Sequence, residues 1–313
     1  MDIKQLKTFV CVAETGSLSR ASDRLRIAQP ALSRHIKLLE HEMGIELFSR
    51  HVRGMHLTDA GRAFLDRVSG LIRQLEQSVY DIQSMSDDVT GEVALGLMPS
   101  INSVFAVRLV ERVTRELPHV SLRLVEGYSG HLVEWLQRGD LDVSFLYGPS
   151  SDYHLHTKEL LYEDIILISP TGSIPHISEK VELREIADLP LIMPSRPHGI
   201  RVVLDSAAAE ANVSLNTALK GDAFWVLKSL VVNGSYHAFV PRSAVAEEIK
   251  SGILEARTFQ SPPIRRQLIL ALPSGRSSTR ATNAVISILK YELAKMIKGG
   301  LWAAQPGSDL PDV

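Results

Sequence analysis

The sequence contains one cysteine, Cys11, among its 313 residues. A single cysteine excludes an internal disulfide, which is the usual staple of small secreted domains. The chain also lacks an apolar run long enough to span a bilayer, and residues 1–5 do not have the pattern of a signal peptide. We therefore expect a cytoplasmic protein, in which Cys11 is a packed core thiol on the apolar stripe of the first helix.

Motifs typical of enzymes are missing as well. The sequence has no Gly-x-Ser-x-Gly elbow, no Gly-x-x-x-x-Gly-Lys phosphate loop and no His-Glu-x-x-His metal helix. Asp152, His154 and His156 form the best candidate for a metal site, but no cysteine or paired histidine completes it, so solvated loop side chains are the better interpretation. The sequence therefore predicts no enzyme, no metal site and no cofactor.

The sequence lacks a large excess of positive or negative charge. The 34 lysine and arginine residues nearly balance the 36 aspartate and glutamate residues, which gives a net charge of −2. Affinity for nucleic acid would therefore have to come from a local patch. Residues 18–62 are the candidate patch, because they hold eight basic side chains against five acidic ones.

Residues 17–54 have the pattern of a winged helix-turn-helix. Ser17 can cap a short helix, and residues 26–28 leave room only for a tight turn. Pro30 fits the first position of a second helix, where its missing N–H costs nothing. The pattern predicts a helix-turn-helix over residues 18–37, with these apolar side chains facing inward: Leu18, Ala21, Leu25, Leu32, Ile36 and Leu39.

The outward face of the second helix carries side chains that can read bases in a major groove. Arg34 can bond guanine in a fork, and Gln29 can pair with adenine. Leu47 and Phe48 then anchor a small wing with a turn at Gly54, from which an arginine can reach the minor groove. An ordinary helix pair with a solvated charged face is the alternative. The predicted DNA-binding residues are Gln29, Pro30, Ala31, Ser33, Arg34, Lys37, Arg50 and Arg53.

A resemblance to a known family rests on a dense, ungapped pattern over residues 1–65. Its elements are Phe9-Val10, Gly16-Ser17-Leu18, Ala21, Leu25, Gln29-Pro30-Ala31-Leu32-Ser33, Ile36, Leu39-Glu40, Gly44, Leu47-Phe48, Arg50, Gly54, Leu57-Thr58 and Gly61. The pattern resembles the LysR-type transcriptional regulators, and it continues more loosely to about residue 296. The resemblance implies a winged helix that binds DNA, a long dimerising helix and a two-lobed domain that senses a small molecule. Residues 27–30 and 58–61 are similar to the nitrogen-assimilation branch.

Three positions depart from the family pattern. Ala28 stands where serine or threonine often caps the recognition helix, so one capping hydrogen bond is lost. His35 stands where glutamine is frequent. Tyr236 stands where glycine is usual in the segment before Pro241, and its ring could fill part of a ligand cleft.

The residues after the wing predict one long helix, from a cap at Thr58 over residues 59–86. Its apolar side chains recur at alternating steps of four and three, which is the seam of a coiled coil. The predicted dimer interface consists of Phe64, Val68, Leu71, Leu75 and Ile82. Packing of this seam onto the winged helix (residues 1–58) and onto the following domain is the alternative, and the family resemblance favours the dimer.

From residue 92 the pattern becomes an alternation of strands and helices, as in a doubly wound α/β sheet. We expect an effector-binding domain over residues 92–298, similar to the periplasmic solute-binding architecture. Lobe I would comprise residues 92–161 and 268–298, and lobe II residues 163–265. Residues 299–313 are rich in glycine, proline and aspartate, so we expect a disordered tail.

A ligand should then lie between the lobes, at loops that leave the carboxyl ends of strands. In the family the loops at Ser100, Ser129, Ser195 and Phe224 commonly line this cleft. Helix starts favour anions, and Arg196 could clamp a carboxylate. As alternatives, Ser100 could cap its own helix and Arg196 could be solvated. The predicted effector-binding residues are Ser100, Ile101, Tyr128, Ser129, Ser195, Arg196, Phe224 and Tyr236.

Together these patterns predict a LysR-like DNA-binding regulator. Each winged helix would read half of a pseudo-palindromic site on double-stranded DNA, with the chains paired as dimers or tetramers and RNA polymerase as a further partner. A small-molecule effector, a carboxylate by the reasoning above, would shift how the dimers sit on DNA. The alternatives are a constitutive regulator without a ligand, and a solute-binding or enzymatic α/β domain fused to a DNA-binding module.

Overall fold

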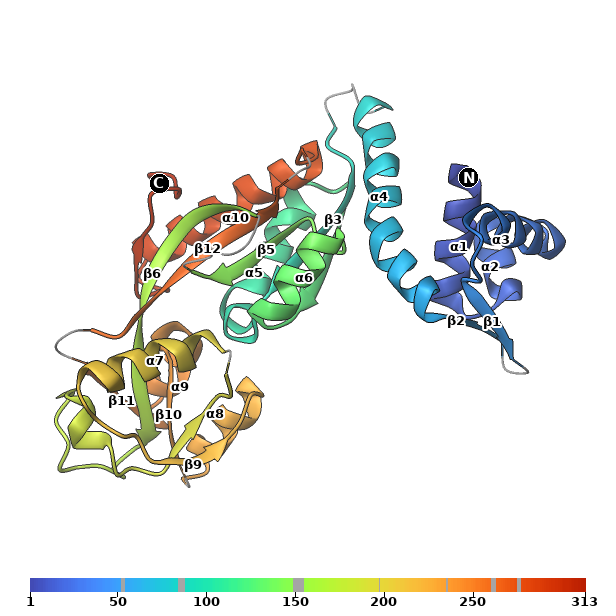
Figure 1. Ribbon diagram of the computed structural model, residues 1–313. Coiled ribbons are helices and arrows are strands. Elements are labelled where there is room, and N and C mark those ends of the chain that lie inside the picture. Colours follow the sequence, from blue (N-terminus) through green and yellow to red (C-terminus); the bar gives the residue numbers. More distant parts are fainter. Residues whose placement is uncertain are drawn as a thin grey trace. The chain divides into compact units, whose positions relative to one another are not determined.

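The computed structural model describes residues 1–51, 54–83, 88–148, 155–196, 198–234, 236–259, 263–274 and 277–313 (Figure 1). Contacts divide the chain into a first unit, which holds residues 1–91 and 137–140, and a second unit, which holds residues 92–136 and 141–313. Among the described residues, no helix is both long and apolar enough to cross a membrane.

The first unit is a winged helix-turn-helix followed by one long helix. Its elements are α1 (Ile3–Thr15), α2 (Leu18–Leu25), α3 (Gln29–Met43), β1 (Phe48–His51), β2 (Gly54–Leu57) and α4 (Asp59–Gln83). Phe9 of α1 is fully buried, with ring centres 5.3 Å from Phe48 and 5.1 Å from Phe64. Cys11 lies in the same core, as expected, and burial raises the pKa of its thiol.

The ends of these helices follow from their capping residues. Ser17 caps α2 through its hydroxyl, and the Thr58 hydroxyl accepts a hydrogen bond from the Gly61 amide at 2.9 Å, as predicted for the two caps. Ala28 precedes α3 and makes no capping hydrogen bond. Because α3 begins at Gln29, Pro30 is the second helical residue and not the first, but amides in a first turn lack partners within the helix, so its ring costs nothing there either.

The wing is held close to the turn that precedes α2. The amide of Met55 donates to the carbonyl oxygen of Gly16 at 3.0 Å. Gly54 has φ 130°, and a Cβ at this position would lie 2.5 Å from the same carbonyl oxygen. Glycine is therefore required at 54, both for the backbone angle and for the close approach. Val52 and Arg53 lie outside the described residues.

The second unit is an α/β domain whose central strands run in the order β4-β3-β5-β12-β6-β10-β8-β9, with β11 and β13 also paired to β6. Its strands are β3 (Gly91–Leu97), β4 (Val120–Glu126), β5 (Val143–Tyr147), β6 (Leu155–Pro170), β7 (Lys180–Val181), β8 (Leu191–Met193), β9 (Thr217–Lys220), β10 (His237–Pro241), β11 (Leu254–Phe259), β12 (Arg265–Pro273) and β13 (Ala304–Pro306). Its helices are α5 (Pro99–Glu116), α6 (Ser129–Arg138), α7 (Gly199–Glu210), α8 (Phe224–Val232), α9 (Ala246–Lys250) and α10 (Arg280–Lys298), with short 3-10 turns at Leu183–Ile186 and Arg242–Val245.

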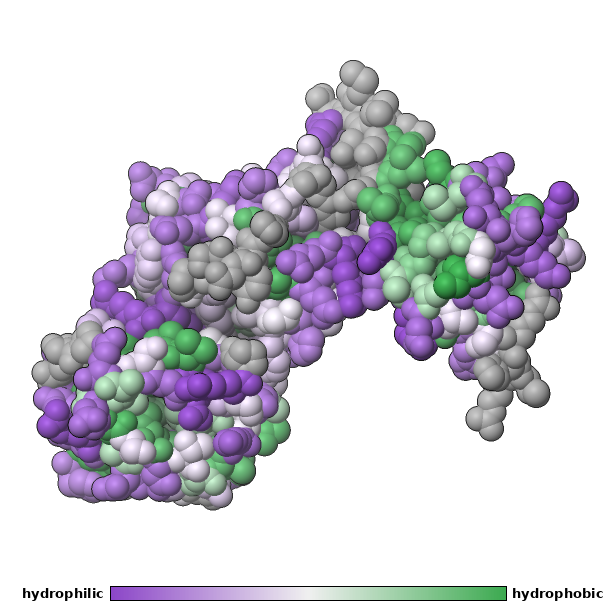
Figure 2. All heavy atoms as spheres, in the orientation of Figure 1, coloured by the Kyte–Doolittle hydropathy of each residue, from purple (hydrophilic) through white to green (hydrophobic). Residues whose placement is uncertain are grey.

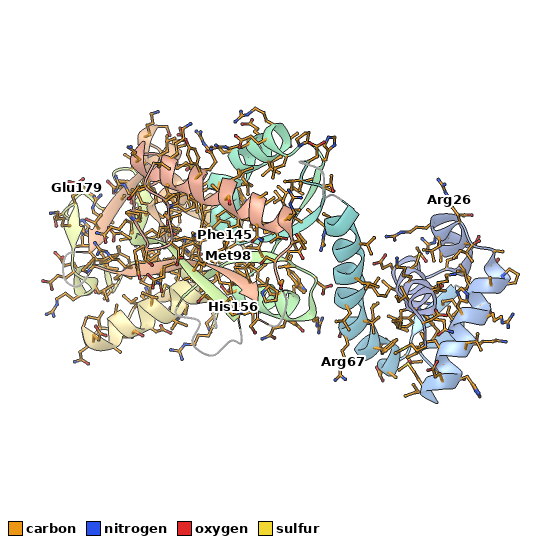
Figure 3. The ribbon with its side chains drawn as sticks, turned by 90° about the horizontal axis from the view of Figure 1, so that it is seen from above. Arg26, Arg67, Met98, Phe145, His156 and Glu179 are labelled. Atoms are coloured by element: carbon orange, nitrogen blue, oxygen red, sulfur yellow. The ribbon has the colours of Figure 1, made fainter. Side chains whose placement is uncertain are left out.

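Two lobes share the long strand β6, which passes from one to the other. It pairs with β12 as far as Asp164 and with β10 from Ile165 onward, so residues near 164 are the crossing point. Lobe I contains α5, α6 and α10, and lobe II contains α7, α8 and α9 (Figure 1). Phe145 of β5 lies inside lobe I, with its ring centre 5.7 Å from that of Phe105 (Figure 3).

The expectation that residues 299–313 form a disordered tail is wrong. Trp302 has no exposed surface, and its ring centre lies 6.3 Å from that of Phe105. Strand β13 pairs antiparallel with β6 at residues 161–163, and the carboxylate of Asp309 accepts a hydrogen bond from the Glu159 amide at 2.8 Å. One buried aromatic ring and a strand of backbone hydrogen bonds order a segment whose composition alone predicts disorder.

Candidate nucleic-acid interface and ligand cavity

The outward face of α3 brings the helical candidates together. Gln29, Pro30, Arg34 and Lys37 are exposed and Ala31 and Ser33 are partly exposed, while Leu32, Ile36 and Leu39 are buried on the opposite face. The face therefore offers a row of donors on a helix held from behind by a core. A shallow groove on it is lined by Pro30, Ser33, Arg34, Lys37, Leu38 and His41.

Leu38 and His41 were not predicted as part of this face, although steps of three and four residues from Arg34 and Lys37 lead to them. His35 belongs to the other side. Its Nδ1 lies 3.0 Å from the hydroxyl of Thr8, so this ring contacts α1. The side chains of Arg50 and Arg53 lie outside the part of the chain that is described, so their predicted roles rest on the sequence.

The predicted dimer interface on α4 has a buried part and an exposed part. Phe64 packs on Phe9 in the core of the winged helix, which is the alternative packing weighed above, and Val68 is buried. Leu71 is 62% exposed and Leu75 43% exposed, and Val79, one turn further along, is exposed too. Figure 2 shows hydrophobic residues gathered along α4. The side chain of Ile82 lies outside the described residues.

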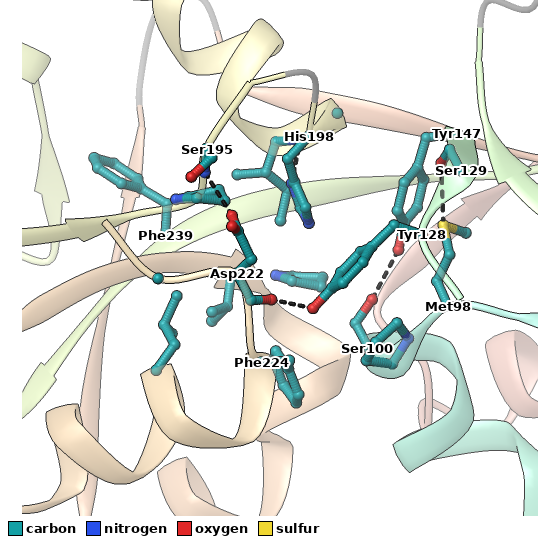
Figure 4. A pocket seen from close by; sticks show the side chains of 18 of the residues that line it. Met98, Ser100, Tyr128, Ser129, Tyr147, Ser195, His198, Asp222, Phe224 and Phe239 are labelled. Atoms are coloured by element: carbon teal, nitrogen blue, oxygen red, sulfur yellow. Dashed lines mark hydrogen bonds between the residues drawn. The ribbon is translucent and has the colours of Figure 1, made fainter. Parts of the chain in front are cut away.

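The second unit contains a cavity of about 510 Å³ between its lobes. The first turns of α5, α6, α7 and α8 all contribute to its wall, together with the ends of strands β5 and β10 (Figure 4). Six predicted effector-binding residues line it, namely Ser100, Tyr128, Ser129, Ser195, Arg196 and Phe224. Helix starts leave backbone amides without intrahelical partners, so this wall favours acceptors on a ligand.

Ile101 and Tyr236 are not among the residues that line the cavity. Ile101 follows Ser100 on α5, and the helical turn points it into the core, where it is fully buried. Tyr236 packs against the apolar cluster that includes Ile166 and Val240. The Tyr236 ring therefore lies against this cluster and not on the cavity wall, and a role for Tyr236 in ligand binding stays a prediction.

Ser100 makes contacts that its own helix does not explain. Met98 occupies the capping position of α5, so Ser100 is not the cap. Its hydroxyl lies 2.8 Å from the hydroxyl of Tyr147, and Nη2 of Arg266 donates to it at 3.4 Å. Burial raises the pKa of Tyr147 well above its usual range, so its phenol stays protonated.

A buried ion pair stands behind this wall, at the crossing of the two lobes. Arg266 is 4% exposed and Glu163 1% exposed, and Nε of Arg266 donates to Glu163 at 2.6 Å. Glu163 also accepts from the hydroxyl of Ser243 at 2.9 Å and from the indole N–H of Trp302 at 3.0 Å. Each of its carboxylate oxygens is therefore hydrogen-bonded, as a buried charge requires.

Lobe II brings His198 and a paired arginine to the cavity. Burial, with the positive charge of Arg266, lowers the pKa of His198 to about 4. Arg196 donates to the carboxylate of Asp205 through Nε at 2.8 Å and lies in a salt bridge through Nη2 at 2.6 Å. The predicted ligand clamp is thus already paired with a carboxylate of its own lobe.

Tyr128 joins the two lobes across the cavity. Its hydroxyl donates to the carbonyl oxygen of Asp222, and its ring centre lies 5.5 Å from that of His198 (Figure 4).

Five residues in or behind the cavity wall were not among the predicted site residues, namely Tyr147, His198, Asp222, Glu163 and Arg266. The sequence did hold a signal for Glu163 and Arg266, because each is a charged residue within an apolar strand.

The metal candidate gains no support. Asp152 and His154 lie outside the described residues, and His156 is in β6. Among the residues that are described, no cluster of three or more histidine, cysteine, aspartate or glutamate side chains could hold a metal ion.

Both units match families of known proteins. The family described as "Bacterial regulatory helix-turn-helix protein, lysR family" matches residues 3–62, and the "LysR substrate binding domain" matches residues 86–294. The HTH-type transcriptional regulator BbuR of Bordetella bronchiseptica is 29% identical over 308 residues, which cover 98% of this chain and 94% of BbuR. The nitrogen assimilation regulatory protein nac of Klebsiella aerogenes is 28% identical over 290 residues, 92% of this chain and 94% of nac.

Solved structures have the same fold over nearly the whole chain. A full-length OxyR variant from Pseudomonas aeruginosa gives a TM-score of 0.75 at 20% identity and covers 99% of both chains. Full-length CbnR in complex with its target DNA gives a TM-score of 0.68 at 19% identity, covering 92% of this chain and 97% of CbnR.

Proposed function

The chain belongs to the LysR family of DNA-binding transcriptional regulators with an effector-binding domain, and from that premise we propose how it works. The outward face of α3 enters a major groove, with Arg34 and Gln29 as base readers and Lys37 on the phosphate backbone. The observation that carries this assignment is the row of exposed polar side chains on a helix whose other face is buried. Arg50 and Arg53 act from the wing.

Helix α4 pairs two copies of the chain. Apolar side chains such as Leu71 and Leu75, exposed in a row, are typical of a surface that a partner covers. Two winged helices then read the halves of a pseudo-palindromic site, and dimers can associate further into tetramers. Operator DNA lies in the bacterial cytoplasm, where RNA polymerase is the further partner.

The cavity holds the effector, a small carboxylate. Support comes from the converging helix starts and from the hydroxyls of Ser100 and Ser129 on its wall. We place no enzymatic step in this domain, because the cavity carries donors for binding and no paired nucleophile and base in the described wall. A regulator that acts without a ligand remains the second candidate.

Selection of bound sequences from random double-stranded DNA tests the proposal. We expect a motif with two related halves, since two copies of α3 read it. A motif with one half only would contradict paired recognition, and the absence of any enriched motif would contradict sequence-specific binding by α3.

A further inference from the structure

Two polar groups on opposite sides of the cavity have protons left to donate. One is the Ser100–Tyr147 pair of lobe I, and the other is His198 of lobe II. In Figure 4 these side chains face the same space. A Cβ on Gly199 would lie 3.5 Å from Cβ of Tyr147, so the start of α7 packs directly on the Tyr147 side chain.

The proton count on lobe I is fixed by the partners of Ser100. Arginine can only donate, so Nη2 of Arg266 uses a lone pair of the Ser100 oxygen. Between Ser100 and Tyr147 one hydroxyl donates and the other accepts. Whichever donates, the other hydroxyl keeps its own proton, and the described residues provide no further acceptor for it.

The proton on His198 is fixed by its backbone contact. Its Nδ1 accepts a hydrogen bond from the Ile200 amide at 3.2 Å, so this nitrogen carries no proton. The neutral ring therefore carries its proton on Nε2. Within the described part of the chain, that N–H has no hydrogen-bond acceptor either.

The Arg266–Glu163 ion pair behind lobe I presents its positive end to the cavity wall, because Arg266 contacts both the Ser100 hydroxyl and the Tyr147 ring, and this end favours an anion over a neutral acceptor. Arg266 is almost fully buried beneath the Tyr147 ring. Of its three guanidinium nitrogens, Nη1 has no partner among the described residues. Asp222 lines the cavity on lobe II, where its carboxylate accepts from the Ser195 amide at 2.7 Å. A second negative group on the ligand would therefore meet a fixed negative charge.

We propose that the cavity is specific for a monocarboxylate, whose two oxygens accept one proton from the Ser100–Tyr147 pair and one from Nε2–H of His198. This assignment rests on the proposed ligand cavity and names its chemistry. The apolar remainder of the acid lies against Phe224, Leu227 and Phe239, and the bound carboxylate joins lobe I to lobe II.

Three six-carbon probes of similar size test the charge requirement on the full chain. Hexanoate, hexanamide and adipate are titrated at neutral pH by calorimetry, with ligand-observed NMR for weak binding. A charge-assisted hydrogen bond is about two times stronger than a neutral one, so we expect hexanoate to bind at least about tenfold more tightly than either other probe. Equal binding of hexanoate and hexanamide, or no binding of hexanoate at millimolar concentration, would overturn the assignment.

Variants identify the donors. His198→Leu removes Nε2–H and should lose about tenfold in hexanoate affinity, while His198→Gln, whose amide can donate from a similar position, should retain most of it. Ser100→Ala and Tyr147→Phe each leave one hydroxyl proton, so the double variant should lose more affinity than the two single variants predict together. Retained hexanoate preference in both His198→Leu and the double variant would place the carboxylate elsewhere.

Binding of the parent protein to its selected DNA site is measured in parallel. A parent that binds DNA but does not prefer hexanoate contradicts the monocarboxylate site alone. A parent that prefers hexanoate but selects no DNA sequence contradicts the regulatory function and supports the chemistry of the cavity.

Discussion

The guanidinium carbon of Arg266 lies 3.8 Å from the centre of the Tyr147 ring. This stacking joins the cavity to the crossing of the lobes, because Tyr147 lines the cavity and Arg266 is paired with Glu163 on β6. The positive charge of Arg266 is thus held close to the Ser100 hydroxyl without direct exposure to solvent.

The C-terminal segment should contribute measurably to stability. Trp302→Phe removes the indole N–H that donates to Glu163, and we expect a loss of about 1–3 kcal/mol in the free energy of unfolding. Trp302→Ala also leaves a cavity and should cost about 3–5 kcal/mol. Urea titration measures both. Leu301→Ala, at the exposed neighbouring residue, is the matched control and should change stability little. Unchanged stability in both Trp302 variants would contradict the anchored segment.

The charge state of His198 should make stability depend on pH. Because its pKa is lowered to about 4 in the folded protein, the unfolded chain binds the proton more tightly. Stability should therefore fall as the pH drops through the ordinary value near 6.5 toward 4. We expect His198→Gln to reduce this loss by about 1–2 kcal/mol between pH 6.5 and 4.5, a figure discounted for the partial exposure of the ring.

Thermal unfolding of the parent and of His198→Gln across this range measures the effect. Burial also lowers the pKa of His237, which both proteins retain, so a residual slope is expected in each. Parallel pH profiles for the two proteins would show that His198 titrates normally in the folded state.

Assembly should depend on the exposed part of α4. Leu71→Asp combined with Leu75→Asp places two charges in the proposed interface between copies, and these would be costly to bury. Light scattering should then report a single chain, and affinity for a full DNA site should fall toward that for a half-site. Ile253→Asp, at an exposed apolar residue of the second unit, is the control. An unchanged particle mass in the double variant would place the interface elsewhere.

The sequence predicted best where a pattern is local. The helix-turn-helix follows from the cap at Ser17 and from apolar spacing, and the structure places Pro30 one position later in α3 and extends this helix to Met43. The loops of the cavity wall were also predictable, since helix starts follow strands in an α/β lobe. Ile101 does not line the cavity because one helical step turns its side chain by about 100° from that of Ser100, into the core.

Contacts between distant residues could not be predicted in this way. Glu163, Ser243, Arg266 and Trp302 meet from separate parts of the chain, and no local period relates them. The disordered tail was predicted from composition, which does not register one tryptophan that finds a buried site. Arg196 was judged by its charge, and its pairing with Asp205 became evident only in the structure.

Recognition of DNA by the outward face of α3 is the central claim, and Arg34→Ala tests it most directly. Affinity of the parent and the variant is measured by fluorescence anisotropy at one salt concentration, on the selected site and on an unrelated sequence. Arg184→Ala, at an exposed arginine of the second unit, is the control. We expect Arg34→Ala to lose about 1–3 kcal/mol on the selected site and much less on the unrelated one, so that specificity relaxes. Parental affinity of Arg34→Ala for the selected site would contradict the assignment of α3 as the recognition helix.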